Sequence, residues 1–111
     1  MNERQKQVLA GSISNLLILL GGKMNELDAL EGEELDSLTA FNNEGERPES
    51  AVISQELRNR MNQVNLLKNT IDQWFNITIQ AMPNVPLNEV NNFLTNTNGQ
   101  IEDFTQRINN I

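Results

Sequence analysis

The chain has 111 residues, of which 38% are hydrophobic, so it suits one domain with a compact core and leaves little material for a deep pocket. Histidine and cysteine are absent, which removes the commonest general base, the thiolate nucleophile, imidazole or thiolate metal sites and any disulfide. The net charge of −7 has the wrong sign for binding DNA, RNA or anionic lipid. We expect no metal, no cofactor, no nucleic-acid partner and no membrane partner.

The first element is a long helix. Apolar residues recur every three or four positions from Leu9 to Leu27, which predicts a helix over residues 3–40. This register continues across Gly21-Gly22, although each glycine inside a helix costs roughly 1 kcal/mol relative to alanine. We therefore expect either a break or a close helix contact at the glycine pair, and we favour a single bent helix.

The same region carries no targeting pattern. Residues 16–20 are the longest continuous apolar run, no convincing cleavage site follows them, and a membrane span needs roughly 20 apolar residues. We expect the protein to be cytoplasmic, or part of a particle that is assembled inside a cell.

The charge imbalance lies in residues 23–50, which hold nine acidic and two basic side chains. A solvated helix face is the simpler interpretation, because leucines alternate with the acids, and the other is a docking strip for a basic partner. A catalytic acid would need a shielded pocket to raise its pKa, so we expect no enzyme activity from these carboxylates. The candidate docking strip consists of Glu26, Asp28, Glu31, Glu33, Glu34 and Asp36.

A loop and a second helix follow. Residues 41–50 are rich in Asn, Gly and Pro and predict an exposed loop. Beyond it, apolar positions alternate in steps of four and three, which predicts a helix over residues 51–82 that the prolines of residues 83–86 close. The apolar stripe on this helix is predicted to be widened by Met61, Leu66, Phe75, Ile79 and Met82.

Two features of the second helix have open interpretations. Arg60 occupies a position of the apolar pattern, so we expect it to lie along the core edge with its stem buried, or to meet an acid from residues 26–36. Trp74-Phe75 is the largest apolar unit of the chain. We interpret it as bundle core, with a partner-binding anchor as the alternative.

The third pattern repeats in steps of three and four and predicts a helix over residues 87–111. Asn98-Gly99 could split this helix, but we favour a continuous one. The sustained 3.5-residue spacing indicates a narrow coiled-coil seam, and the poor helix formers on the other face predict that a partner must stabilise it. The predicted interaction seam is Leu87, Val90, Leu94, Ile101, Phe104, Ile108 and Ile111.

Three long helices with short connections predict an all-α, elongated, antiparallel three-helix bundle that forms a single domain and is completed by oligomerisation. The function that we expect is a non-enzymatic assembly protein, a structural or adaptor subunit of a larger complex such as a phage particle or secretion apparatus. Its partner would be a second copy or another protein. The alternative is a small acidic regulator, a chaperone or inhibitor, that docks on a basic partner protein.

Overall fold

The structure, a computed structural model, describes residues 1–41 and 53–111, and for residues 38–41 it describes the backbone alone. All regular structure in these ranges is helical, which confirms the all-α prediction. The predicted loop lies outside the described residues, except for Phe41, which ends the first helix. The elements are α1 (Glu3–Phe41), α2 (Gln55–Ala81), the 3-10 turns η1 (Met82–Asn84) and η2 (Leu87–Glu89), and α3 (Val90–Asn109).

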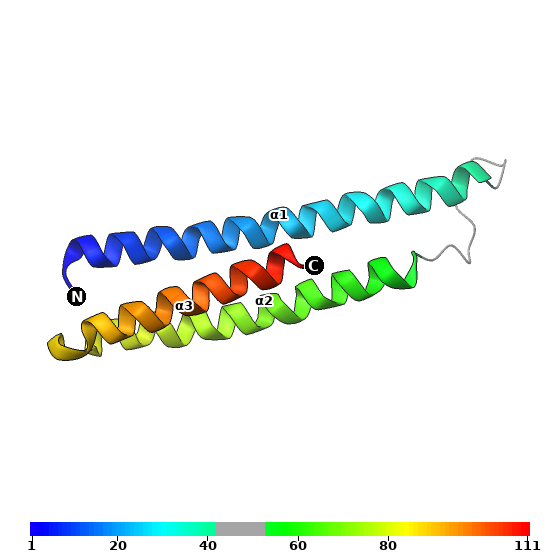
Figure 1. The fold of residues 1–111 in the computed structure, drawn as a ribbon. Helices are drawn as coiled ribbons and strands as arrows, with labels where there is room; N and C mark the ends of the chain where they lie inside the picture. The colour runs from blue at the N-terminus through cyan, green and yellow to red at the C-terminus, as the bar shows by residue number, and fades with distance from the viewer. Residues whose placement is uncertain (42–52) are drawn as a thin grey trace.

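The three helices form a rod. Its principal extents are 67 × 20 × 20 Å, so the elongated three-helix arrangement is confirmed. Figure 1 shows that α1 and α3 run in one direction and α2 in the other, and that α3 ends midway along the rod. One half of the rod is therefore three helices thick, whereas the half beyond the end of α3 contains only α1 and α2.

The core follows the apolar spacing of each helix. Side chains at the predicted helical positions of α1, α2 and α3 meet in one cluster, and Trp74 packs against its edge. Burying an aliphatic or aromatic side chain of this size stabilises a fold by about 1.5–3 kcal/mol, so this cluster is the main source of stability. The buried members are Leu16, Leu20, Leu27, Leu57, Val64, Leu67, Ile71, Phe104 and Ile108.

The start of α2 depends on a contact with α1. Ser54 is the N-cap, and its Oγ accepts a hydrogen bond from the Leu57 N–H at 3.2 Å. The Ser54 N–H and Oγ–H in turn donate to the carboxylate of Glu34 at 2.6 and 3.1 Å. A negative charge at a helix N-terminus is also favoured by the helix dipole, so Glu34 helps to fix where α2 begins.

Prolines separate α2 from α3. Pro83 lies within η1 and Pro86 is the N-cap residue of η2, so the chain turns through two short 3-10 segments before α3 begins at Val90. The third helix therefore starts three residues later than predicted. Proline lacks an N–H donor and restricts the residue before it, which explains why neither α-helix extends through this stretch.

The two helices that contain glycine, α1 and α3, continue through their glycines. α1 is unbroken across Gly21-Gly22, and α3 is unbroken across Asn98-Gly99, as predicted. However, a Cβ atom added at Gly21 or Gly22 would have no neighbouring atom within 4 Å. The described part of the chain thus provides neither the break nor the close helix contact that the glycine pair led us to expect.

Candidate interaction surfaces

Most of the predicted interaction seam on α3 faces the inside of the chain's own bundle. Phe104 and Ile108 belong to the core cluster, and at the other extreme Leu87 is 90% exposed. A partner would have to displace α1 or α2 to reach the inner seam positions, so an assembly surface has to be sought elsewhere on the rod. The other seam residues are Val90, which is buried, and Leu94, Ile101 and Ile111, which are half-buried.

Trp74 uses its ring within the bundle. The Trp74 and Phe104 ring centroids lie 5.4 Å apart with an interplanar angle of 71°, an edge-to-face contact between α2 and α3. The Arg107 guanidinium lies 5.8 Å from the centroid of the same Phe104 ring. Phe75, the other half of the candidate anchor, is half-buried. This arrangement favours the core interpretation of Trp74 over the anchor interpretation.

Glu26 and Glu34 of the candidate acidic strip have partners within the fold. Glu26 lies 3.2 Å from Lys23 Nζ and 3.8 Å from an Arg60 guanidinium nitrogen. Glu34 accepts the hydrogen bonds from Ser54. Of the remaining members, Asp28, Glu33 and Asp36 are exposed and Glu31 is half-buried. The surface that a basic partner could use is therefore smaller than the sequence indicates.

Arg60 connects all three helices. Its Nε donates a hydrogen bond of 2.7 Å to the main-chain oxygen of Ile111, just beyond α3, while its guanidinium lies near Glu26 of α1. The Arg60 side chain is only 28% exposed. Both sequence-based expectations for Arg60 are met, since its stem is largely buried and its head meets an acid of α1.

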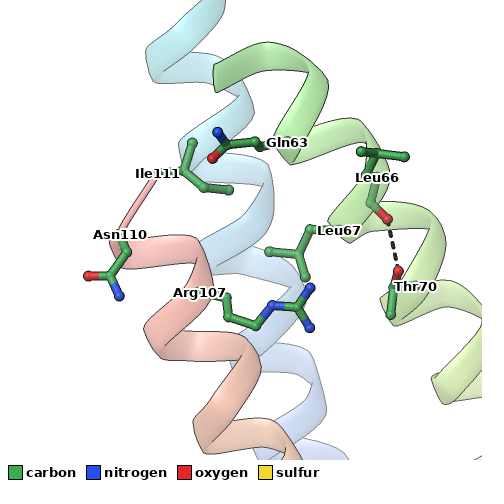
Figure 2. Close-up of a pocket in the computed structure, with 7 residues that line it drawn as sticks. All are labelled: Gln63, Leu66, Leu67, Thr70, Arg107, Asn110 and Ile111. Atoms are coloured by element: carbon green, nitrogen blue, oxygen red, sulfur yellow. Dashed lines mark hydrogen bonds between the residues drawn. The ribbon is translucent and has the colours of Figure 1, made fainter. Parts of the chain in front are cut away.

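A groove lies between α2 and the last turn of α3, with a volume of about 330 Å³ (Figure 2). Its only charged lining residue is Arg107, which lies 3.9 Å from Asp103, and the Thr70 hydroxyl donates to the Leu66 carbonyl at 3.0 Å. Such a lining offers an apolar wall and amide groups, and none of its seven side chains carries a carboxylate. The lining residues are Gln63, Leu66, Leu67, Thr70, Arg107, Asn110 and Ile111.

The described side chains contain no group of three or more acidic residues that could hold a metal ion.

Over Glu3–Ser37, α1 is long and apolar enough to cross a membrane, by length and composition alone. Its most apolar 18-residue window has a mean hydropathy of 1.2, and 22% of that window is buried in the bundle. Counting only continuous apolar residues missed this segment. Core helices and signal sequences share such a composition, so the prediction of no membrane partner stays a prediction.

Several large apolar side chains of α1 and α2 are more than half exposed. On α1 these are Val8, at 62% exposed, and Ile18, at 69%; on α2 they are Leu66 and Ile77, both at 68%. The prediction that Leu66 and Ile79 widen the buried stripe of α2 is wrong, because Ile79 also counts among the exposed residues. Leu66 lies five positions before the buried Ile71, which places the two side chains roughly 140° apart around the helix.

Comparisons of the chain with protein-family models, with curated proteins and with solved structures find no match. The functional argument therefore depends on the residues of this chain.

Proposed function

We propose that this protein is a non-enzymatic assembly protein, a structural or adaptor subunit of a larger complex such as a phage particle or secretion apparatus. The observation that carries the proposal is the exposure of Val8, Ile18, Leu66 and Ile77 on the surface of a narrow rod. Single exposed apolar residues are normal on protein surfaces, but these four are large aliphatic side chains, each more than half exposed, and a contact with another chain would remove them from water.

Association would bury these side chains. Complete burial of one such side chain is worth about 1.5–3 kcal/mol, so a contact that covers several of them offsets part of the entropy lost on association. A rod offers long faces to neighbouring subunits, which is the geometry that a structural or adaptor subunit needs.

Native mass spectrometry and sedimentation velocity of the purified protein test this proposal. We expect species at multiples of the 12.6 kDa chain mass, and their fraction should rise with protein concentration. Because the contact is apolar, these species should persist at high ionic strength. A monomer at every concentration up to that of a saturated solution would contradict self-assembly.

A second candidate is the acidic regulator, which is favoured by the exposure of Asp28 and Glu33 on α1. The double variant Glu31→Gln/Glu33→Gln separates the two functions, because it removes two charges without touching the Glu34 contact to Ser54. The assembly proposal predicts that the oligomers of this variant match those of the wild type. Loss of a salt-sensitive complex in this variant would favour the regulator.

A further inference from the structure

We propose that the outer face of α1 packs against the same face of a second copy of this chain, with the two α1 helices antiparallel. We define the outer face as the side of α1 that is turned away from the buried Leu9, Leu16 and Leu20. It carries the exposed Gly11, Ile18 and Gly22 and the exposed, uncharged polar residues Gln7, Ser14 and Asn15, and Leu17 and Gly21 lie at its margin. This inference rests on the proposed function and adds to it the surface, the partner and the orientation. Figure 1 shows α1 along one side of the rod, and α2 and α3 both lie along the opposite side of the rod.

The middle of α1 contains no charged residue anywhere around the helix. Residues 7–22 lack Asp, Glu, Lys and Arg. Their inner side, which includes Leu9 and Leu16, is buried in the bundle, whereas Ile18 on the outer side is 69% exposed. A helix that is uncharged and largely apolar all round is typical of a helix with neighbours on every side. The bundle supplies neighbours on one side only.

Of the glycines in the uncharged segment of α1, Gly11 and Gly22 lie on the outer side and the half-buried Gly21 lies at its margin. Gly11, Gly21 and Gly22 have open space where a Cβ would stand, so no contact within the described chain requires their small size. Glycine weakens a helix, yet three occur within twelve residues of this one. Small residues let the backbones of two helices approach closely. A second helix on this face supplies the close contact that the single chain lacks.

The charges at the two ends of α1 select the antiparallel orientation. Arg4 and Lys6 precede the uncharged segment, together with Glu3, which lies 3.4 Å from Lys6 Nζ. Lys23 and then the six acids from Glu26 to Asp36 follow it, so residues 1–6 carry a net charge of +1 and residues 23–36 a net charge of −5. Two antiparallel copies in the register that sets Lys6 of each beside Asp28 of the other place the basic end of each α1 beside the acidic stretch of its partner. A parallel pair would instead place the six acids of both copies side by side, and the resulting repulsion disfavours it.

A helix of the second copy fits this face better than a lipid surface does. Glycine offers almost no apolar area to lipid, whereas it permits close helix packing. The acidic stretch that begins at Glu26 also lies next to the face, where an anionic membrane would repel it.

The first test uses Gly11→Gln/Gly22→Gln. Glutamine is a better helix former than glycine and fits the open space within the chain, so the monomer keeps its fold. Its bulk keeps a second helix away, and we expect the dimer dissociation constant in sedimentation velocity to rise at least tenfold. The matched control is Gly99→Gln at an exposed, equally open glycine of α3, which should leave the dissociation constant within twofold of wild type.

The second test addresses orientation through Lys6 and Asp28. The single variants Lys6→Glu and Asp28→Lys each create a like-charge contact in the antiparallel pair and should weaken association severalfold at low salt. The double variant Lys6→Glu/Asp28→Lys exchanges the two charges and should restore association to near the wild-type level. Failure of the double variant to recover would overturn the antiparallel pairing.

Further outcomes separate this inference from the proposed function. If the wild type assembles and Gly11→Gln/Gly22→Gln assembles equally well, the outer face of α1 is not the contact, while the assembly function survives. If the wild type is monomeric at all concentrations, both fail. If the wild type is monomeric but cosediments with vesicles of pure phosphatidylcholine, and Ile18→Asp abolishes that binding, the face binds lipid and the pairing of copies is wrong.

Discussion

The Nε of Arg60 donates a hydrogen bond of 2.7 Å to the main-chain oxygen of Ile111, across fifty-one positions of sequence. This contact holds the stretch after α3 against α2 at the level where the rod narrows from three helices to two (Figure 1). The same guanidinium lies 3.8 Å from Glu26, so one side chain joins all three helices at this point.

Replacing Arg60 with alanine should lower the free energy of unfolding by about 1–2 kcal/mol, since a charged hydrogen-bond donor in a largely buried site is lost. Most of this effect should come from the Ile111 contact, because the Glu26 carboxylate is half exposed and such pairs contribute little. Urea denaturation followed by circular dichroism measures it. The matched control Arg58→Ala removes an exposed arginine two residues away and should change stability by less than about 0.5 kcal/mol.

Glu34→Gln should destabilise the protein by about 0.5–1 kcal/mol, because the capping carboxylate at the start of α2 loses its charge. Its exposed neighbour Glu33 is the control, and Glu33→Gln should leave the melting temperature unchanged. Equal melting temperatures for both variants would mean that the contact to Ser54 does not stabilise the helix start.

Two residues of the predicted interaction seam, Leu87 and Ile108, should respond differently to the same substitution. Ile108→Asp places a charge in a fully buried position and should unfold the protein or cost several kcal/mol. Leu87→Asp changes a residue that is 90% exposed and should alter stability by less than about 0.5 kcal/mol. Thermal denaturation of the two variants checks this contrast. A large loss in the Leu87 variant would show that this residue is covered in the assembled protein.

Gly99→Ala should raise the free energy of unfolding by about 0.5–1 kcal/mol. The added methyl group meets no atom within 4 Å, and alanine favours the helix that already runs through this position. Chemical denaturation of wild type and variant at equal concentration measures the gain. An unchanged or lower stability would indicate that the site is contacted by something outside the described residues.

The helices could be predicted because their core positions repeat at helical spacing over several turns, as Leu9, Leu16 and Leu27 do in α1. The contact between Glu34 and Ser54 could not be predicted in this way, because it joins residues twenty positions apart. Spacing within one helix does not show which neighbour covers each position. This is why the exposure of Leu66 was missed.

The candidate site was predictable only in part. The seam residues of α3 stand out by their regular spacing, but spacing alone does not distinguish a contact with a partner from a contact with α1 and α2 of the same chain. The glycine pair of α1 indicated a contact with a partner more clearly than the spacing of the α3 seam did. Residues that weaken a helix and have no contact within the described chain point to a contact outside it.

Cross-linking of single-cysteine variants tests the central claim most directly, because the chain has no cysteine of its own. Lys6→Cys and Asp28→Cys chains should be mixed in equal amounts and treated with a short bismaleimide cross-linker. In antiparallel pairs that set position 6 of one copy beside position 28 of the other, the two copies of position 6 lie roughly 33 Å apart along the helix axis. The account predicts a covalent dimer in the mixture and none in either variant alone. A dimer formed within each variant alone, or no dimer in the mixture, would contradict it.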